Sequence, residues 1–503
     1  MEQSRLQHIV IAGGGTAGWM AAAMFARFFQ RNPAATITLV ESEDIPTVGV
    51  GEATVPQILD FIRRLGIDEI EFIRATHATY KLGIRFDGWA GEGSSFFHPF
   101  ADFGVSLLGT PFRHHWTRLR KSGTAGPLDE YCLASRMAEH GTFALPTRSK
   151  SGSYAFNYAF HFDASLVAAY LRDWATARRV ERVAGTIVAV ERAPDGDVEG
   201  VTLDDGRTLT GDMFIDCSGF RGLLIEQALE TGLEDWSHWL LCDRAIAVPC
   251  ESRLAPAPYT RSLAVGAGWQ WRIPLQHRVG NGQVYCSEYV TDEQALAQLL
   301  ANVEGPLLGQ PRQLRFTAGM RRKIWSHNVF SLGQASGFLE PLESTSIYLV
   351  QKGLSALLAS FPTREALPAI RDVVNAEQRA HWEHVRDFII LHYALNRRHG
   401  EPFWDRCRTM DLPDTLATQI ERFRSAGVLP ADPTDFFRDS SWLALFSGLG
   451  ELAGWHHPAA DDHDADALNA ELSNMAAAMD SAARTAPLHA DFIARNCAIA
   501  ERV

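Results

Sequence analysis

A glycine-rich turn near the start of the chain constrains the fold more than any other stretch. Residues 8–12 form an apolar strand, and Gly13-Gly14-Gly15-Thr16-Ala17-Gly18 then satisfies GxGxxG and leads into a helical pattern over residues 19–29. A second strand pattern, residues 36–40, ends in Glu41. This order is typical of a βαβ unit that binds a dinucleotide, with the pyrophosphate at the helix N-terminus and the acid on a ribose hydroxyl. The alternative is a tight strand-to-helix turn.

Further glycine turns favour FAD over NAD as the dinucleotide. A buried-looking strand at residues 212–216 ends in a second glycine turn, and two glycine turns at strand ends suit an extended FAD better than NAD. Gly333, in a turn after a strand at residues 329–332, is a further expected cofactor residue. Only one complete GxGxxG is present, so we expect no separate nicotinamide site. A glycine-rich loop precedes the helical pattern at residues 57–65. We interpret it as a strap over the flavin rather than an ordinary surface loop. The strap residues expected at the cofactor are Gly49, Gly51, Glu52 and Ala53.

Composition narrows the remaining classes of function. The chain of 503 residues is 46% hydrophobic, which is enough for a large core in one large or two fused domains. A formal net charge of -13 provides no positive field for a nucleic-acid backbone. Seven scattered cysteines without a CxxC pair are typical of reduced thiols and indicate neither disulfides nor a metal site. With no signal-peptide pattern and no apolar run of membrane-spanning length, we expect a cytoplasmic protein.

One strand pattern carries a lysine of interest. Residues 79–86 alternate, which places Lys81, Gly83 and Arg85 on one face of a strand. On spacing alone, Lys81 is expected to be a solvated strand lysine. The nearby segment Phe96-Phe97-His98-Pro99-Phe100 is aromatic, and its side chains are by default core or turn residues.

Two tryptophans are expected side by side on another strand. In Gly268-Trp269-Gln270-Trp271-Arg272-Ile273-Pro274, the period of two places both indole rings on one face, where they form a wall. Ordinary core packing is the alternative.

A carboxylate and several hydroxyl groups precede a helical pattern over residues 348–359. The stretch Leu342-Glu343-Ser344-Thr345-Ser346 is suited to holding an anion and polarising a nearby donor. Taken alone, it is also typical of a helix cap.

Helical periods dominate after residue 363. We therefore expect a FAD-binding domain with a substrate-side sheet over residues 1–362 and a helical subdomain over residues 363–503. The predicted fold class is α/β (α+β), with a Rossmann-like flavin monooxygenase-type fold.

Together these motifs resemble the flavin-dependent tryptophan halogenase family over essentially the whole chain. Residues 13–18 match its GxGxxG, and residues 269–274 match its WxWxIP, the more specific signal. Lys81 matches the family lysine, and the loop at Glu343 matches its glutamate-bearing active-site loop. His98-Pro99-Phe100 matches its aromatic-sandwich segment.

The resemblance implies a chemistry for these residues. Reduced FAD from a separate flavin reductase, oxygen and a halide ion yield hypohalous acid, which passes through a tunnel to Lys81 beside an electron-rich aromatic substrate. Lys81 forms a chloramine or orients the electrophile as a donor. Glu343 polarises the reagent or stabilises the charge that develops on the ring. Trp269 and Trp271 form a barrier between substrate and flavin.

The resemblance also implies binding residues. Thr345 and Ser346 are the expected halide site, and because the family has glycine at the position of Ser346, we expect bromide to be used better than chloride. The expected substrate contacts are His98, Pro99, Phe100 and Ser344. Ser440-Ser441-Trp442 lacks the tyrosine pair of tryptophan-specific members, so the expected substrate is an indole-like or other electron-rich ring rather than free tryptophan.

Two other functions remain open on the sequence alone. A flavin-dependent aromatic monooxygenase that hydroxylates or epoxidises needs neither the lysine nor the tryptophan wall. A non-catalytic flavin-binding sensor would hold FAD without halide-dependent turnover. A homodimer is an open alternative to a monomer.

Overall fold

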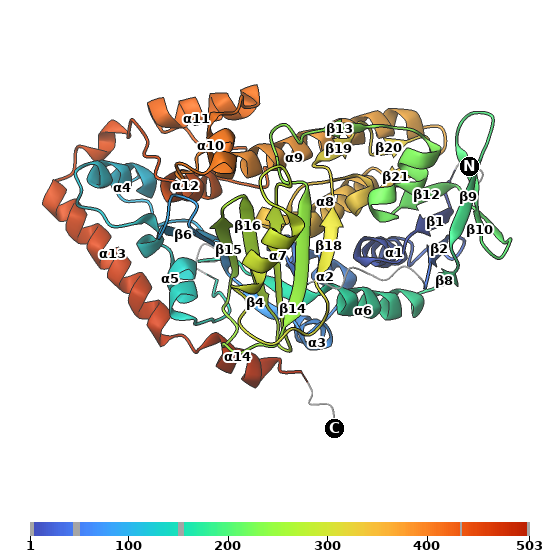
Figure 1. Ribbon diagram of the computed structural model, residues 1–503, viewed down its shortest axis with the longest axis horizontal. Coiled ribbons are helices and arrows are strands. Elements are labelled where there is room, and N and C mark those ends of the chain that lie inside the picture. Colours follow the sequence, from blue (N-terminus) through green and yellow to red (C-terminus); the bar gives the residue numbers. More distant parts are fainter. Residues whose placement is uncertain (1–4, 44–50, 149–154, 433–434, 500–503) are drawn as a thin grey trace. The chain divides into compact units, whose positions relative to one another are not determined.

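Figure 1 shows the computed structural model, which describes residues 5–43, 51–148, 155–432 and 435–499. The chain divides into two compact units. Unit 1 comprises Met1–Ala78, Phe162–Asp243 and Arg315–Glu383. Unit 2 comprises Thr79–His161, Arg244–Leu314 and His384–Val503. The predicted mixed α/β fold is confirmed in both units.

A six-stranded sheet forms the centre of unit 1. Its strand order is β20-β21-β12-β1-β2-β8, and neighbours pair in parallel except for β20 with β21. The central strands are apolar on both faces, as expected for a parallel sheet covered by helices. The strand bounds are Trp325–Ser326 (β20), Val329–Ser331 (β21), Met213–Asp216 (β12), His8–Ala12 (β1), Thr36–Glu41 (β2) and Val180–Ala184 (β8).

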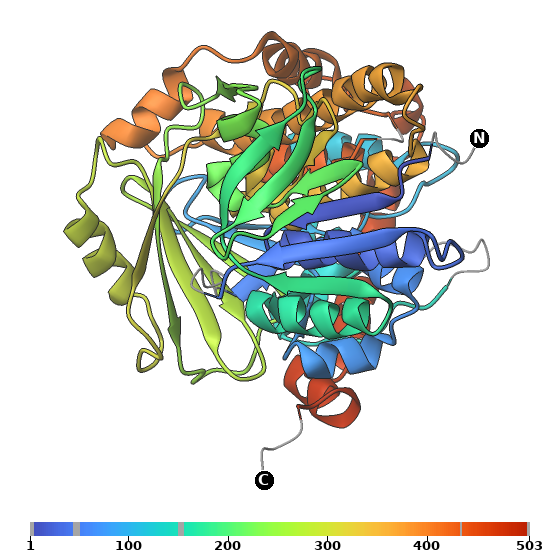
Figure 2. The same cartoon turned by 90° about the vertical axis from the view of Figure 1, so that its right-hand side faces the viewer.

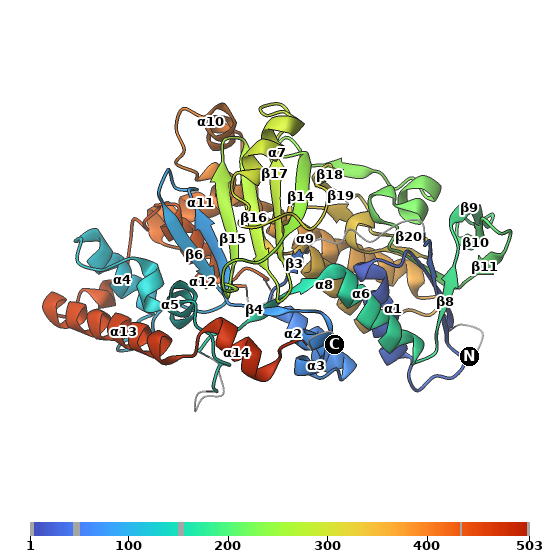
Figure 3. The ribbon, with the colours of Figure 1, turned by 60° about the horizontal axis from the view of Figure 1, so that its bottom comes forward.

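Helices pack on this sheet. Helices α1 (Thr16–Phe28) and α6 (Ala164–Thr176) lie side by side (Figures 1 and 3), and α1 also contacts α8 (Ser346–Ala359). The run of three alanines in the middle of α1 is fully buried, and such small side chains permit close approach of a neighbouring helix. Helix α2 (Gln57–Leu65) has the predicted bounds and is followed by α3 (Glu69–Ala75). In Figure 2 the teal helix α6 runs along the sheet that contains the blue strands β1 and β2.

Smaller sheets complete unit 1. Strands β9 and β10 form an antiparallel hairpin, and β11 joins it. A second small sheet has the order β13-β19-β22. The bounds are Ile187–Arg192 (β9), Val198–Leu203 (β10), Thr208–Thr210 (β11), Leu233–Asp235 (β13), Gly319–Arg321 (β19) and Gly337–Phe338 (β22), with β3 at Gly51–Ala53.

Unit 2 is built on a seven-stranded sheet. The strand order is β18-β14-β17-β16-β15-β5-β6, and Figure 3 shows its strands β14, β17, β16 and β15 next to one another. Helix α7 (Asp292–Leu300) contacts β17 and begins with a capping box at Thr291. The bounds are Arg312–Arg315 (β18), Arg244–Cys250 (β14), Val279–Tyr285 (β17), Gly268–Pro274 (β16), Thr260–Val265 (β15), Gly83–Asp87 (β5) and Ser95–Pro99 (β6).

The single strand predicted for residues 79–86 is wrong, because the chain forms two strands there. Strand β4 (Thr79–Lys81) pairs antiparallel with β7 (Ala159–Asp163), whereas β5 belongs to the seven-stranded sheet. The break lies at Leu82, whose N–H donates to the carbonyl of Pro258 (2.7 Å) and whose carbonyl accepts from the N–H of Phe100 (2.9 Å). These two bonds extend the pairing of β5 with β15 and β6 by one residue, so the chain passes from β4 into the seven-stranded sheet at Leu82.

Helices dominate after residue 363, as predicted. Helix α9 (Leu367–Ala394) starts in unit 1 and ends in unit 2, so residues 363–503 contribute to both units. The proposed domain boundary at residues 362 and 363 stays a prediction. The other helices of unit 2 are α4 (Phe112–Lys121), α5 (Leu133–His140), α10 (Pro402–Thr409), α11 (Asp414–Ala426), α12 (Asp439–Gly448), α13 (Ala465–Thr485) and α14 (His489–Asn496).

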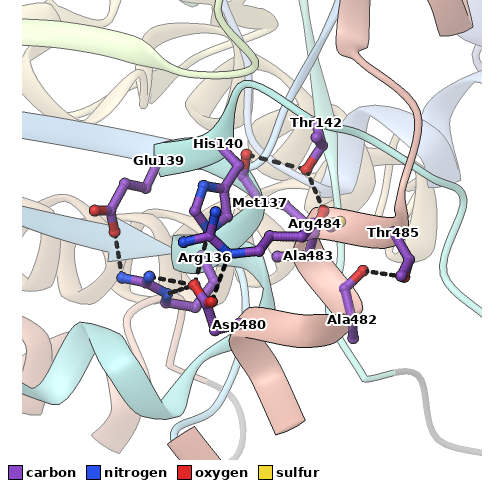
Figure 4. Close-up of polar contacts among 10 residues, drawn as sticks. All are labelled: Arg136, Met137, Glu139, His140, Thr142, Asp480, Ala482, Ala483, Arg484 and Thr485. Atoms are coloured by element: carbon purple, nitrogen blue, oxygen red, sulfur yellow. Dashed lines mark hydrogen bonds and ion pairs between the residues drawn. The ribbon is translucent and has the colours of Figure 1, made fainter. Parts of the chain in front are cut away.

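A charged cluster joins α13 to α5 (Figure 4). The carboxylate of Asp480 forms an ion pair with the guanidinium of Arg136. It also accepts hydrogen bonds from His140 Nε2 and from Arg484 Nε, both at 2.7 Å. Hydrogen bonds from Arg136 and Arg484 hold the pKa of Asp480 well below its usual range. The hydroxyl of Thr142 adds a bond to the carbonyl of Ala483 (2.9 Å).

Candidate active site

The first glycine turn, at the start of α1, has backbone N–H groups that no side chain of the turn's glycines covers. Gly13 has φ of +115°, and a Cβ there would lie 2.4 Å from the carbonyl oxygen of Cys217. A Cβ at Gly18 would lie 1.9 Å from the carbonyl of Gly13, so neither position accepts a side chain. Gly15 is the N-cap of α1 without a side-chain cap, and a Cβ there would meet no heavy atom within 4 Å. The turn therefore fits a pyrophosphate held by backbone N–H groups.

Glu41 ends β2 and lies over this turn. A Cβ at Gly14 would come within 1.8 Å of Glu41 Oε2. The carboxylate accepts from Trp19 Nε1 (3.1 Å) and pairs with Arg182 of β8. The sequence indicated the acid but not Arg182, since no local pattern joins two residues from separate strands. The contact of Glu41 with a ribose hydroxyl stays a prediction.

The other predicted glycine turns of unit 1 lie beside the first one. Gly333 has φ of +62°, and a Cβ added there would lie 3.1 Å from the Cβ of Ala17. The short helical turns Gly219–Arg221 and Gly333–Ala335 contact each other. Asp216, fully buried at the end of β12, accepts N–H bonds from Leu224 and Ile225, both 2.8 Å, and so orders the second turn.

The strap is described from Gly51 onward. Gly49 lies outside the described residues. Gly51 and Ala53 are buried in β3, and burial raises the pKa of Glu52 between them to about 7. A carboxyl group with this pKa exchanges a proton near neutral pH. Its contact with the flavin stays a prediction.

The loop before α8 carries the predicted hydroxyl residues. Thr345 occupies the N-cap position of α8, and its side chain makes no cap bond. Its Oγ1 is buried and has no hydrogen-bond partner among the described residues. Ser344 has φ of +60°, an uncommon conformation for a residue with a side chain, and Ser346 is the first residue of α8. Glu343, in the short turn Pro341–Glu343, is 1% exposed. A buried unpaired hydroxyl at a helix N-terminus is suited to bind an anion.

Lys81 is fully buried, so the expectation of a solvated lysine is wrong. Both faces of β4 are covered, and the exposed fraction of Lys81 is 0%. The ammonium Nζ lies 5.1 Å from the centroid of the Phe100 ring. Phe100 is fixed near β4 through its bond to the backbone of Leu82. The structure therefore brings together two of the predicted site residues, a cation and an aromatic ring face.

His98 is packed in an aromatic cluster of unit 2. It is 3% exposed in β6, next to Pro99, and its ring centroid lies 5.6 Å from that of Phe388 and 6.1 Å from that of Phe437. The rings of Phe388 and Phe437 stack at 3.6 Å. Sequence reasoning missed these two phenylalanines, because they lie in and after long helical patterns where aromatic residues are usually core residues.

The tryptophan pair forms as predicted. Trp269 and Trp271 are buried, and their ring centroids lie 6.0 Å apart. Trp271 lies over Gly282 of the neighbouring strand, where a Cβ would come within 2.0 Å of the indole. Glycine at position 282 is therefore required by the tryptophan. The barrier role stays a prediction.

The candidate residues fall into both units. Lys81, His98, Phe100 and the tryptophan pair belong to unit 2, whereas Glu343, Ser344, Thr345 and Ser346 belong to unit 1. The convergence of Lys81 and Glu343 stays a prediction. No cluster of metal-ligating side chains is found, and no helix is long and apolar enough to cross a membrane, within the ranges that the structure describes.

Comparison with known proteins decides the family. The family model described as tryptophan halogenase matches residues 8–465, most of the chain. The chain belongs to the tryptophan halogenase family. It is similar to tryptophan 7-halogenase RebH of Lentzea aerocolonigenes, with 35% identity over 89% of this chain and 90% of the relative. Tryptophan 6-halogenase ThaL of Streptomyces albogriseolus shares 36% identity over 89% of this chain and 90% of the relative.

Solved structures of flavin-dependent halogenases share the fold. BrvH from Brevundimonas sp. BAL3 superposes with a TM-score of 0.94 at 44% identity, over 98% of this chain and 100% of that one. Xcc4156 from Xanthomonas campestris has a TM-score of 0.95 at 42% identity, over 99% of this chain and 100% of that one. This member of the family is therefore a flavin-dependent halogenase that uses FAD, supplied in reduced form by a separate reductase, together with halide and an aromatic substrate. The glycine turn of unit 1 fits that cofactor.

Proposed function

We propose that this halogenase directs hypohalous acid to Lys81 for electrophilic halogenation of an indole-like ring. The burial of Lys81 with its ammonium over Phe100 carries this proposal. An ammonium is a strong hydrogen-bond donor, and a hypohalous acid molecule offers an oxygen acceptor to the N–H groups of Lys81. Phe100 supplies an apolar face on which an aromatic substrate stacks.

Each remaining residue has one task in the reaction. Bound FAD supplies the oxidising chemistry that converts halide into hypohalous acid. The halogen bonds to a ring carbon, the O–halogen bond breaks toward hydroxide, and the proton of the ring carbon leaves to give water. The carboxylate of Glu343 stabilises the positive charge on the ring, accepts that proton and passes it to the hydroxide. Thr345 Oγ1 and the N-terminus of α8 hold the halide, and Ser346 there favours the larger bromide ion.

An aerobic assay tests the proposal. The protein is supplied with FAD, a flavin reductase, NADH and a set of indoles, with bromide and chloride in parallel, and products are identified by mass spectrometry. We expect halogen isotope patterns, with bromide used better than chloride. Lys81→Ala is expected to abolish halogenated product while hypohalous acid is still released. Normal halogenation by that variant, or a gain of one oxygen independent of halide, would contradict the proposal.

Location and assembly complete the proposal. We place the protein in the cytoplasm, because all seven cysteines are buried as free thiols. A homodimer is the assembly that we propose to test by light scattering.

A further inference from the structure

A buried hydrogen-bond chain runs behind Lys81 in unit 2. The hydroxyl of Thr79 donates to the carbonyl of Pro274 at 2.7 Å and lies 3.0 Å from His161 Nδ1. His161 Nε2 lies 2.9 Å from the hydroxyl of Thr260. The side chains of Thr79, His161 and Thr260 are 0%, 0% and 5% exposed. The chain therefore joins β4, β7, β15 and the end of β16.

These contacts fix the tautomer of the imidazole. Thr79 has a single hydroxyl proton and gives it to Pro274, so His161 Nδ1 must be the donor to Thr79 Oγ1. Nε2 then carries a lone pair, which accepts the hydroxyl proton of Thr260. Every polar atom of the imidazole is paired in one neutral form, and a buried network that is fully paired in this way is rigid.

The same chain lies on the face of β4 that carries Lys81. Thr79 and Lys81 are two residues apart in the strand, so their side chains point to the same face, and Thr79 is directly opposite His161 in the β4–β7 pair. Lys81 is opposite Ala159, whose methyl group cannot orient an ammonium. The polar side chain next to Lys81 across β7 is therefore His161.

We infer that His161 is a positioning residue for Lys81. The neutral imidazole donates to Thr79 and accepts from Thr260, and in this way it fixes β4 against β15 and β16. Lys81 is then the cation on this face of β4. The inference rests on the proposed role of Lys81.

The charges that face His161 support a neutral imidazole. Burial, followed by electrostatic repulsion from Lys81, His489 and Arg272, holds the pKa of His161 well below its usual range. Lys81 lies on β4 and Arg272 on β16, so a cation approaches from both strands, whereas His489 on α14 is a neutral donor to Pro256 and acceptor from Tyr80. A proton on His161 would place a second positive charge beside Lys81 and would remove the acceptor of the Thr260 hydroxyl.

A matched pair of variants at position 260 tests the inference. Thr260→Val keeps the shape of the side chain but removes the proton that pairs His161 Nε2, whereas Thr260→Ser keeps the hydroxyl. The quantity measured is the ratio of halogenated product to hypohalous acid released, with FAD, reductase, bromide and an indole that the unaltered protein halogenates. We expect Thr260→Val to lower this ratio by about tenfold, on the scale of a small misplacement of a reacting group. Thr260→Ser is expected to retain it, and total hypohalous acid is expected to be the same in both.

A pH profile tests whether the imidazole stays neutral. Thr260→Val leaves Nε2 in a more apolar, buried place, so His161 is expected to stay neutral and the lowered ratio to be the same at pH 8 and pH 6. The unaltered protein and Thr260→Ser are expected to show a flat ratio over this range. His161→Asn, which keeps a donor near Thr79 and loses the acceptor for Thr260, is expected to behave like Thr260→Val.

Two results would overturn the inference, and they are distinguishable. Equal ratios for Thr260→Val and Thr260→Ser at every pH would remove His161 from the positioning of Lys81 and leave the proposed function intact. An unchanged ratio in Lys81→Ala, or no hypohalous acid from the unaltered protein, would overturn the proposed function together with the inference.

Discussion

Lowering the pH from 7 to 5 is expected to destabilise this protein through His489, which starts helix α14. The imidazole is 1% exposed, and its Nδ1 lies 2.8 Å from the carbonyl of Pro256, to which it must donate. Its Nε2 therefore carries a lone pair and accepts the backbone N–H of Tyr80 at 3.2 Å. A proton on Nε2 would face that N–H, so two donors would meet.

The magnitude follows from the change in proton affinity on folding. Burial lowers the pKa of His489 from 6.5 to about 4, although its bond to Pro256 acts in the opposite direction. The unfolded chain therefore binds the proton first as the pH falls, and stability is lost between the unfolded and folded pKa values. The full loss is about 3 kcal/mol, of which about 2 kcal/mol falls between pH 7 and pH 5.

Urea titrations followed by tryptophan fluorescence at both pH values measure this loss. His489→Gln removes the titration while its amide oxygen keeps an acceptor for Tyr80, so its free energy of unfolding should fall by about 2 kcal/mol less than that of the unaltered protein. The exposed His399 provides the control, because His399→Gln is expected to leave the pH dependence unchanged. An equal loss in the unaltered protein and in His489→Gln would refute the assignment of a neutral, buried imidazole.

Two further predictions concern carboxylates. Glu343→Gln is expected to slow halogenation by about 100-fold or more, which is the scale for removal of one preorganised stabilising group, while release of hypohalous acid continues. A single-turnover rate of halogenation equal to that of the unaltered protein would contradict this prediction. Asp480→Asn removes the charge that pairs with Arg136 between α13 and α5, and it is expected to lower the thermal midpoint measured by circular dichroism. The exposed Asp462→Asn serves as its control, and equal midpoints would show that the cluster adds no stability.

The parts of the fold that the sequence predicted well are those specified by short-range patterns. The turn at residues 13–18 needs glycine because Gly13 and Gly18 approach backbone atoms too closely for a side chain, and this requirement is visible in the sequence as GxGxxG. Helix α2 was predicted to its end because Gly66, in the left-handed conformation, terminates it.

Contacts between distant segments account for what the sequence did not predict. The chain leaves β4 at Leu82 because the partners of its backbone are Pro258 and Phe100, and no local pattern identifies them. Arg182 and Glu41 meet for a similar reason, since β2 and β8 become neighbours only when the parallel sheet forms.

The burial of Lys81 shows why the sequence pattern of one strand does not predict the exposure of a side chain at the candidate active site. Alternation placed the lysine on one face of a strand, and Lys81 does lie in a strand, β4. The further step, that the lysine face is the solvated one, was wrong because both faces are covered. Tyr80 stacks on Phe143 at 4.2 Å, and Lys81 lies over Phe100 beside the chain that contains His161. A buried ammonium adds desolvation cost to the folded state, so a position that needed only packing would favour an apolar side chain. A buried lysine at this point therefore fits the role in the reaction that we propose for it.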